Sequence, residues 1–586
     1  MEMSGAFLGV ESSLTGRRWL GPLAEVERQA EAIAQATGYP DVLSRVLANR
    51  GVVAPEAEAF LSPSLRDLMP DPSTLLDMDK AAARIFEALQ NGERIAVFAD
   101  YDVDGATSAA QLLSWFRSLG NQATLYIPDR LTEGYGPNDK AMERLGKSHD
   151  LVICVDCGTV ANGPIQVAVN SGADVIVLDH HMGGETLPPA LAVVNPNRQD
   201  ETSEYTYLCA AAVVFLTLVA VNRFMRDAGK SAPPLLDMLD LVALGTVADV
   251  APLVGFNRAL VRQGLTVMAG RNRPGLVALG DVAALNSAPK AYHLGYLLGP
   301  RINAGGRIGK ADLGARLLTT TDIHEAQALA ERLDALNKDR REIEAQVQAG
   351  AEAEAESRGL DGPLVWAAHR GWHAGVVGIV ASRLKEKYNR PAVVIGIDDE
   401  GVGHGSGRSI SGIDLGAAIA ALVREGFITK GGGHKMAAGL SVAEGDIEAA
   451  MAVLSDKLAK QGAGEIGPRD LSVTAIIGSG TASPELIEQI EAAGPFGAGA
   501  PAPRFAIPAA RIRFAKPAGE NHLRLTVDNG SGPIDMIAFR AFESDLGAAL
   551  LNHAGQSFHF AGRLEIDEWG GRRKAKLQLE DAAKAV

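Results

Sequence analysis

The sequence has little cysteine, few aromatic residues and no long apolar run, and these shortages exclude several classes of protein. Three cysteines in 586 residues, Cys154, Cys157 and Cys209, cannot build a disulfide framework and indicate a reducing compartment. The longest apolar stretch, residues 208–221, is too short to span a bilayer and predicts a buried helix. The N-terminus lacks the basic start and apolar run of a signal peptide. We therefore expect a soluble, cytoplasmic protein with no membrane contact.

The sequence also lacks a surplus of positive charge. The formal net charge of -15 argues against a nucleic-acid partner, because phosphate binding depends on Lys and Arg. Net charge averages over the whole surface, however, whereas binding depends on local patches. Two segments are locally basic, residues 301–316 and 572–576. The composition thus excludes a uniformly basic surface but leaves local nucleic-acid tracks open.

The chain is too long for one hydrophobic core, and three to four domains are expected. After a helical, proline-punctuated start, apolar strands alternate with helices, which predicts a parallel α/β sheet. A long helical pattern over residues 322–357 leads to a second α/β region. The strands expected in the first region cover residues 95–99, 123–127, 151–155, 175–178 and 192–194.

Residues 97–110, VFADYDVDGATSAA, place three carboxylates at alternate positions after an apolar strand. Asp100, Asp102 and Asp104 would repel one another and raise each other's pKa, so a divalent metal among them is the cheapest solution. The alternative is an acidic turn in which Gly105 supplies a positive φ. This stretch alone does not decide between the two.

Two further strand ends favour the metal. Asp156 follows the strand LVICV, and Asp179, His180 and His181 follow the strand VIVL. In parallel α/β sheets the functional residues gather at the carboxyl ends of the strands. A single Asp at a strand end is usually a cap or a turn residue, but three neighbouring strand ends of this kind indicate a site.

Asp249, in GTVADVAPL, is a fourth contributor of the same type. For this residue alone the alternative is favoured, namely a loop after a helix over residues 235–244 with Gly245 as its C-cap. Mixed Asp and His ligation suits Mn²⁺ and admits Mg²⁺. Seven such side chains are too many for one ion, so two ions about 4 Å apart and a phosphoester or phosphoanhydride hydrolysis are expected. The seven are Asp100, Asp102, Asp104, Asp156, His180, His181 and Asp249.

Two glycine-rich segments of the second α/β region suit a close approach of backbone to phosphate oxygens. GHGSGRSI, residues 403–410, carries Ser and Arg, and GGGHKMAAG, residues 431–439, carries His and Lys. We interpret both as loops, with a pair of ordinary tight turns as the alternative. From about residue 468 short strands dominate, with one helix over residues 484–493. A five-stranded barrel of the OB type fits this part, and a purely structural β domain is the alternative.

The ordered set VFADYDVDGATS, VICVDCGT, VLDHHMGG, GTVADVAPL and GGGHKMAAG resembles the DHH phosphoesterase superfamily with its DHHA1 domain. IPDRLTEGYG, GPRINAGGRIGKADLGARLL, LNKDRREIE and AAGPFGAGAPAPRF are similar to the RecJ branch of single-strand-specific DNA exonucleases. The resemblance runs from about residue 45 to the C-terminus. It implies an α/β fold of two lobes joined by a long helix, followed by an all-β OB-like barrel. The implied parts are a helical lead-in (1–80), a DHH catalytic domain (81–320), a connecting helix (321–360), a DHHA1 domain (361–465) and an OB-like domain (466–586).

The resemblance also implies an activity and the residues that carry it. The expected enzyme is a 5′-to-3′ exonuclease that uses two Mn²⁺ or Mg²⁺ ions to hydrolyse single-stranded DNA to 5′-mononucleotides, in DNA repair and recombination. The implied ligands are Asp102, Asp104, Asp156, His180 and Asp249, with Asp156 bridging, while Asp100 and His181 line the same site as ligands or substrate contacts. The implied catalytic residues are His181, Asp156 and His434. The implied contacts to the 5′-phosphate and the strand are Arg130, Tyr135, Arg301, Arg307, Ser406, Arg408, Gly432, Gly433 and His434.

Single-stranded DNA is the partner that the resemblance implies. A single-strand-binding protein and a helicase are further candidates, and a monomer is expected. Two other functions are weighed against the exonuclease. A DHH phosphodiesterase acting on short oligonucleotides or cyclic dinucleotides would not need the C-terminal β domain. A catalytically dead DNA-binding scaffold would not need the complete set of acids and histidines.

Overall fold

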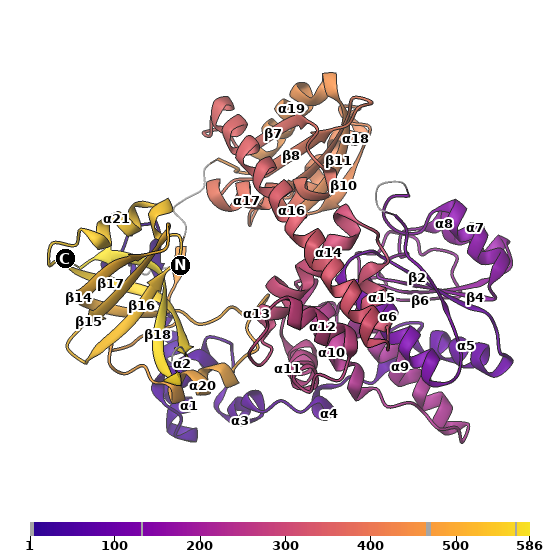
Figure 1. The fold of residues 1–586 in the computed structure, drawn as a ribbon, viewed down its shortest axis with the longest axis horizontal. Helices are drawn as coiled ribbons and strands as arrows, with labels where there is room; N and C mark the ends of the chain where they lie inside the picture. The colour runs from indigo at the N-terminus through magenta and orange to yellow at the C-terminus, as the bar shows by residue number, and fades with distance from the viewer. Residues whose placement is uncertain (1–4, 130–132, 465–469, 569–570, 586) are drawn as a thin grey trace.

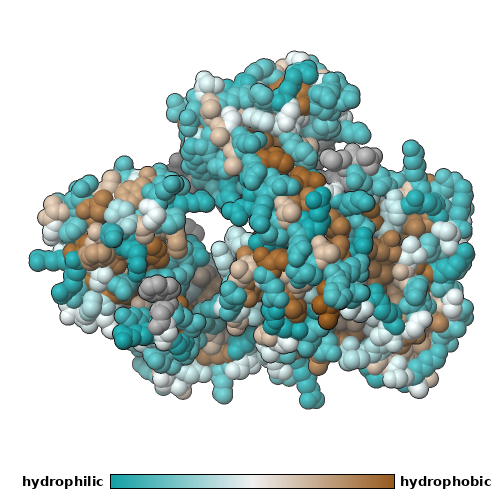
Figure 2. Space-filling view, viewed as in Figure 1, coloured by the Kyte–Doolittle hydropathy of each residue, from teal (hydrophilic) through white to brown (hydrophobic). Residues whose placement is uncertain are grey.

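In the computed structural model, which describes residues 5–129, 133–464, 470–568 and 571–585, three bodies surround a central opening (Figure 1). Two α/β lobes are stacked on one side of the opening, and a β-barrel lies across it from them. The space-filling view shows that side chains do not fill this opening (Figure 2). The described residues include no helix with the length and apolarity needed to cross a membrane.

The first lobe is built on a five-stranded parallel sheet in the order β3-β2-β4-β5-β6. Its central strands are buried on both faces, which explains their near-continuous apolar sequences. The strands are β2 (Ile95–Ala99), β3 (Thr124–Tyr126), β4 (Leu151–Val155), β5 (Asp174–Leu178) and β6 (Ala192–Val194). One face packs on α5 (Met78–Asn91), α6 (Val103–Ser118) and α9 (Ala210–Asp227), and the other on α7 (Asp139–Ser148) and α8 (Asn162–Asn170). The predicted parallel α/β sheet is thus confirmed.

A second, all-helical core of this lobe packs against the far side of α6. Its first helix is α10 (Leu239–Ala248), which has Asp249 as its C-cap. The interpretation of Gly245 as a C-cap is therefore wrong, because the helix continues beyond it to Ala248. A Cβ on Gly245 would lie 2.5 Å from Thr107 Oγ1 and 2.7 Å from Ala211 Cβ, so the glycine permits close packing of α10 on α6 and α9. The others are α11 (Gly255–Ala269), α12 (Pro274–Val282), α13 (Ala291–His293), the π-helix η5 (Leu294–Leu298), α14 (Gly299–Ile308) and α15 (Leu313–Thr319).

The long helix α16 (Ile323–Arg358) joins the two lobes, as predicted. Its first half contributes residues such as Leu333 to the helical core of the first lobe, and its second half contributes Val347 and Ala351 to the second lobe. Because each half of this one continuous helix packs into the core of a different lobe, it fixes the two lobes relative to each other (Figure 1).

The second lobe has a mixed five-stranded sheet in the order β10-β11-β9-β8-β7. Both glycine-rich segments lie in this sheet, so their interpretation as loops is wrong: the first forms β9, and the second forms the hairpin of β10 and β11. The strands are β7 (Val365–Arg370), β8 (Ala392–Ile397), β9 (Val402–Arg408), β10 (Lys430–His434) and β11 (Ala437–Ala443). The helices are α17 (Ala374–Tyr388) on one face, and α18 (Leu415–Arg424) and α19 (Ile447–Ala459) on the other.

The C-terminal body is a closed five-stranded barrel in the order β14-β15-β16-β18-β17, with β17 returning to β14. This order, with a helix between the third and fourth strands, is that of an OB fold. The sequence predicts one helix in this part, and that prediction is wrong, because its described residues form two α-helices. Helix α20 (Pro484–Ala492) precedes the barrel, and α21 (Asp545–Leu551) connects its third and fourth strands. The strands are β14 (Phe505–Ala518), β15 (His522–Asp528), β16 (Pro533–Ala538), β17 (Ser557–Asp567) and β18 (Lys574–Lys584), extended by β13 (Ala475–Ile476).

The N-terminal residues belong to the same body as the barrel. Strand β1 (Arg18–Leu20) pairs with β12 (Asp470–Ser472), and α1 (Ala24–Thr37) and α2 (Asp41–Ala48) share the hydrophobic core of the barrel. The chain then passes through α3 (Ala57–Leu61) and α4 (Leu65–Leu68) to the first lobe. Arg262 of α11 ties the parts together there, because its Nη1 donates to Leu61 O at 2.7 Å and Ala492 O at 2.9 Å.

Candidate metal centre

Three neighbouring strands of the first lobe end in polar side chains at one edge of the sheet. Asp100 follows β2, Asp156 follows β4, and Asp179 and His180 follow β5. Because the strands are parallel and paired in register, their carboxyl ends meet at this edge. The structure therefore brings together the strand-end residues that the sequence singles out.

The first turn of α6 adds two carboxylates to the same edge. Asp102 is the N-cap of α6, and its Oδ1 accepts hydrogen bonds from the amides of Asp104 and Gly105 at 2.8 and 3.1 Å. The carboxylate of Asp104 accepts from the first amides of α9, Ala210 N at 2.7 Å and Ala211 N at 2.9 Å. Helix N-termini stabilise negative charge, so the backbone holds both acids in place.

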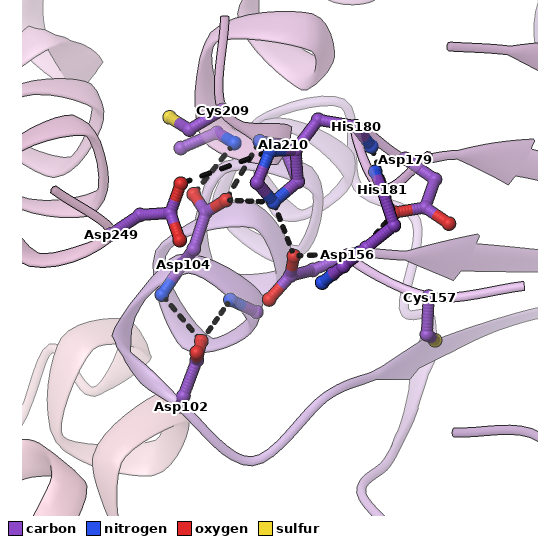
Figure 3. Close-up of polar contacts among 12 residues, drawn as sticks. Asp102, Asp104, Asp156, Cys157, Asp179, His180, His181, Cys209, Ala210 and Asp249 are labelled. Carbon is purple, nitrogen blue, oxygen red and sulfur yellow. Dashed lines mark hydrogen bonds and ion pairs between the residues drawn. The ribbon is translucent and has the colours of Figure 1, made fainter. Parts of the chain in front are cut away.

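His180 lies at the centre of the cluster (Figure 3). Its Nε2 is 3.3 Å from Asp156 Oδ1 and 3.7 Å from Asp104 Oδ2, and its Nδ1 is 3.8 Å from Asp249 Oδ2. Nε2 is buried and has no hydrogen-bond partner among the described residues. A buried imidazole nitrogen that faces carboxylates without a hydrogen bond is well placed to be a metal ligand.

The potential ligand atoms fall into groups that share members. Three groups of three side chains each place one ligand atom per residue within 4.8 Å of the others. Two of the groups share Asp156 and two share His180, so the cluster offers adjoining sites rather than one, as a two-ion arrangement requires. The groups are Asp156, His180 and His181; Asp104, His180 and Asp249; and Asp100, Asp102 and Asp156.

The electrostatics of the cluster also call for a cation. Burial raises the pKa of the Asp156 carboxyl well above its usual range, and the neighbouring Asp102 and Asp104 raise it further. Burial, followed by repulsion from Asp104 and Asp102, raises the pKa of Asp249 to about 9. Buried carboxylates that repel one another cost free energy until a positive charge lies among them. The oxygen and imidazole donors fit Mn²⁺ or Mg²⁺.

Asp179 supports this cluster from behind, a role that the sequence interpretation missed. Its Oδ1 accepts from His181 Nδ1 at 2.8 Å and His180 N at 2.8 Å, and its Oδ2 accepts from Thr159 Oγ1 at 2.6 Å. Burial alone would raise the pKa of Asp179, but the hydrogen bonds from His181 and Thr159 and the charges of the two histidines together lower that pKa. Burial opposes the charge on His181, yet the hydrogen bond to Asp179 and the negative charges of Asp179, Asp249 and Asp102 together raise the pKa of His181 to about 9. Asp179 thus orients both histidines.

The second lobe offers a small polar cradle beside the start of α17. In β9, Arg408 Nη1 donates to Ser406 Oγ at 2.9 Å. A Cβ on Gly378, in the second turn of α17, would lie 2.9 Å from Ser406 Oγ and 3.1 Å from Arg408 Nη2, so helix and strand approach closely. Arg307 Nη1 of α14 donates to Gly375 O at 3.0 Å and links this cradle to the first lobe. An Arg and a hydroxyl near a helix N-terminus suit a phosphate group.

The remaining residues that are predicted to bind substrate differ in whether they contact the acidic cluster. Tyr135 reaches the cluster, with its hydroxyl 3.3 Å from both Asp156 O and His181 Nε2. Arg301 is engaged elsewhere, because its Nε donates to Asp334 at 2.9 Å. Gly432, Gly433 and His434 are exposed on β10, and among the described residues no hydrogen bond or ion pair joins His434 to the acidic cluster. Arg130 lies outside the described residues.

The segment that leads into the barrel packs directly against the loop after Asp249. Leu253 N donates to Ala498 O at 2.8 Å, and a Cβ on Gly497 would lie 2.7 Å from Leu253 Cδ1. Gly499 has a φ of +64°, and a Cβ there would lie 2.9 Å from Pro252 Cβ. The position of Asp249 therefore depends on a segment that lies about 250 residues further along the chain.

Replacing Gly499 with alanine is expected to weaken Mn²⁺ binding by a fewfold and to destabilise the protein by about 1–2 kcal/mol, because the left-handed backbone is strained and the methyl group meets Pro252. Gly519→Ala is the matched control, since its φ is +63° but nothing lies within 4 Å of its Cβ. Calorimetric Mn²⁺ titration and thermal unfolding compare the two. Equal metal affinity in both variants would show that the contact does not position Asp249.

Comparison with known proteins identifies the family. Family models match residues 94–246 (DHH family, N-terminal domain), 361–460 (DHHA1 domain) and 475–581 (RecJ OB domain). Single-stranded-DNA-specific exonuclease RecJ of Dickeya dadantii is 37% identical over 567 residues, 92% of this chain and 96% of that protein. The protein of the same name from Escherichia coli is 36% identical over 586 residues, 95% of this chain and 98% of that one.

A solved structure agrees with the sequence matches. The crystal structure of RecJ in complex with Mn²⁺ from Thermus thermophilus has a TM-score of 0.80 and 30% identity, and the match covers 96% of this chain and 79% of that one. Agreement at this level extends over both lobes and the barrel, and that structure contains one of the ions that the cluster fits. The chain belongs to the RecJ family of single-stranded-DNA-specific exonucleases.

Proposed function

We propose that this protein is a metal-dependent exonuclease that degrades single-stranded DNA from the 5′ end to 5′-mononucleotides. The observation that carries the proposal is the buried cluster of Asp and His side chains, whose ligand groups adjoin through Asp156 and His180. The family relationship supports the substrate. The cradle of Ser406 and Arg408 supports the polarity, because a terminal 5′-phosphate offers the oxygens that an Arg fork and a hydroxyl bind.

The proposed ligands are those that the sequence indicates. Asp102, Asp104, Asp156, His180 and Asp249 would hold two divalent ions, with Asp156 between them, and Asp100 belongs to the same set through its group with Asp102 and Asp156. When bound, the ions supply Lewis acidity and lower the pKa of the attacking water. The scissile phosphate would lie between the first and second nucleotides, so the 3′-oxygen of the first nucleotide leaves and takes up a proton.

His181 is the proposed source of that proton. Its Nδ1 is bound to Asp179 at 2.8 Å, which leaves Nε2, at 3.3 Å from the Tyr135 hydroxyl, to carry the proton. Tyr135 would pack against the leaving nucleotide, and its exposed ring is oriented edge-on to His181. His434 would contact the scissile phosphate from the second lobe, and we propose Arg130, Arg301, Arg307, Gly432 and Gly433 as further contacts to the strand.

The outer face of the barrel carries side chains that are suited to binding a long single strand. Phe514 and Lys516 alternate on β14, and Arg524 stands beside Lys516 on the paired strand β15. Phe514 and Phe539 are each 52% exposed. Aromatic faces interleaved with cations are how OB folds bind single strands without reading their sequence. A phosphodiesterase acting on dinucleotides would not need such a face.

Digestion of end-labelled oligonucleotides tests the proposal. With Mn²⁺ or Mg²⁺, a 5′-phosphorylated single strand should yield 5′-mononucleotides progressively from its 5′ end, whereas a blunt duplex should resist. Digestion from the 3′ end would overturn the polarity, and preference for dinucleotides or cyclic dinucleotides over long strands would favour a small-substrate phosphodiesterase. No turnover with either metal, together with tight strand binding, would identify a DNA-binding scaffold.

Replacing Arg408 with alanine is expected to remove most of the preference for a 5′-phosphate, about tenfold in kcat/KM, because a charge-assisted hydrogen bond to the terminal phosphate is lost. Rates on 5′-phosphorylated and 5′-hydroxyl strands measure the preference. Arg424→Ala is the control, since Arg424 is exposed on α18, on the other face of the same sheet. An unchanged ratio in Arg408→Ala would place the 5′-phosphate elsewhere.

We also propose that the enzyme works in the cytoplasm as a monomer. The three cysteines are all free and buried, which is consistent with a reducing compartment. An enzyme restricted to single strands needs unwound substrate, so a helicase and a single-strand-binding protein are the proposed partners. Size-exclusion chromatography with light scattering tests the monomer, and digestion of a duplex with and without an added helicase tests the coupling.

A further inference from the structure

Two stacked tyrosines are exposed on the turn that joins α13 and η5. Tyr292 is 66% and Tyr296 74% exposed, and their ring centroids are 5.1 Å apart with planes inclined by 25°. Large aromatic rings are usually buried, because each removes a considerable apolar area from water. Two rings that stack on each other and still expose outer faces form a flat apolar surface to which a further ring can add.

The backbone beneath these rings is held rigidly. Leu294 and Leu298 of η5 are buried in the helical core, and Lys290 N at the start of α13 donates to His293 Nδ1 at 3.0 Å. The π-helical turn itself is a rare conformation that is frequently found at functional sites. A surface held in place before binding loses little conformational entropy when a ligand adds to it.

The turn also lies next to the candidate metal centre. A Cβ on Gly295 would lie 3.5 Å from Val247 Cγ1, and a Cβ on Gly299 would lie 3.4 Å from Ala248 Cβ. Both neighbours belong to the last turn of α10, directly before Asp249. In Figure 1, α13 borders the central opening between the lobes and the barrel. The exposed rings are therefore carried by the element that packs against a metal-ligand helix on the side of the opening.

We propose that Tyr292 and Tyr296 form a stacking platform for an unpaired base of the DNA strand near the metal centre. This inference rests on the proposed exonuclease function and adds a base contact to it. The flat aromatic face of a base can stack on the exposed face of the outer tyrosine, and such stacking tolerates any of the four bases. A paired base has both faces covered within its duplex, so the platform also favours single strands over double strands.

Abasic scanning in a binding-competent, slow variant tests the platform. In an Asp156→Asn background, fluorescence anisotropy measures the Kd for 5′-phosphorylated oligonucleotides that carry one abasic position at successive sites. The variants are Tyr292→Leu with Tyr296→Leu, which keeps apolar bulk without aromatic faces, and Tyr292→Phe with Tyr296→Phe, which keeps the faces. Phe427→Leu, a partly exposed ring of the second lobe, is the control. Both tyrosines are exposed, so circular dichroism should show intact folds.

The double Leu variant should bind an intact strand about tenfold more weakly, whereas the double Phe variant and the control should stay within about twofold of the parent. One abasic position should weaken the parent about tenfold and leave the double Leu variant unaffected, because the same contact is already lost. Full affinity in the double Leu variant, or an abasic penalty equal in both proteins, would overturn the platform. Absence of single-strand digestion by the wild type would instead overturn the proposed function.

Discussion

Replacing Asp156 with asparagine is expected to lower the rate of single-strand digestion by about 10³-fold or more, because both ions of the proposed pair depend on this carboxylate. A neutral amide oxygen is a weaker ligand and offsets no positive charge. Asparagine is the suitable replacement, since Asp156 has a φ of +58°, a left-handed conformation that Asn tolerates and Ala does not. Initial rates on an end-labelled strand and calorimetric Mn²⁺ titration measure the two losses, while strand binding should persist.

The same variant should be no less stable than the wild type without metal. Burial and repulsion raise the pKa of Asp156 in the folded state, so this group binds protons more tightly when folded. Its contribution to stability therefore falls as the pH rises above the unfolded pKa, and it is unfavourable at neutral pH. Removing it should raise the unfolding temperature of the first lobe in the metal-free protein by about 2–4 °C if about 1 kcal/mol of repulsion is relieved and the lobe unfolds as a unit.

Added Mn²⁺ should then reverse the order of stability. The wild type should gain more from saturating Mn²⁺ than Asp156→Asn does, because only ligands bound in the folded state shift the unfolding equilibrium. Asp398→Asn, which removes a carboxylate after a strand of the second lobe, is the control and should behave as wild type in rate and Mn²⁺ response. Wild-type activity or an undiminished Mn²⁺ response in Asp156→Asn would contradict the shared-ligand role.

The part of the site that the sequence predicts well is local in origin. Apolar strands followed at once by Asp156 or by Asp179 and His180 predict both the parallel sheet and the edge where its ligands meet, because strand direction decides where the next residue points. The start of α6 is harder to place. Asp102 serves as the N-cap, so the helix begins at Val103 within the run of aspartates, and Asp104 lies in its first turn.

The second lobe contains a signal that the interpretation as loops overlooks. Gly403, Gly405 and Gly407 recur at every second residue, which is the period of a strand. On β9 they face neighbouring side chains so closely that a Cβ on Gly405 would lie 2.9 Å from Leu440 Cγ. These glycines are needed for packing within and against the sheet, whereas a phosphate loop would need them for backbone freedom.

Other features have no local signal. Residues 18–20 pair with residues 470–472, and the segment around Gly499 meets the loop after Asp249. Each contact joins parts of the chain that are hundreds of residues apart, and the sequence pattern of neither segment indicates which segment it contacts. Such contacts decide how the barrel is placed relative to the two lobes and how the loop after Asp249 is held at the metal centre. They can be recognised only in the folded structure.

Replacing Asp179 with asparagine is expected to weaken Mn²⁺ binding or digestion by about 10- to 100-fold although every proposed ligand remains. Asp179 accepts hydrogen bonds from His181 Nδ1, from His180 N and from Thr159 Oγ1. An amide offers one acceptor oxygen, so at least one of these donors would face an NH₂ group and the histidine pair would turn. Calorimetric titration with Mn²⁺ and initial rates on a 5′-phosphorylated strand measure the effect.

Thr159→Val tests the contribution of Asp179 Oδ2 separately from that of Oδ1, which accepts from the histidines. It removes the hydroxyl that donates to Asp179 Oδ2 at 2.6 Å and accepts from Asn195 Nδ2 at 2.8 Å, while Thr159 N still donates to Oδ2 at 3.1 Å. It should therefore cost about 1 kcal/mol, roughly fivefold, by loosening Asp179 without removing its bonds to the histidines. If Asp179→Asn lowers Mn²⁺ affinity, the residue acts by orienting His180 as a ligand. If it lowers only the rate, the residue acts through the proton that His181 holds. Wild-type affinity and rate together would contradict both roles and leave Asp179 as a buried structural acid.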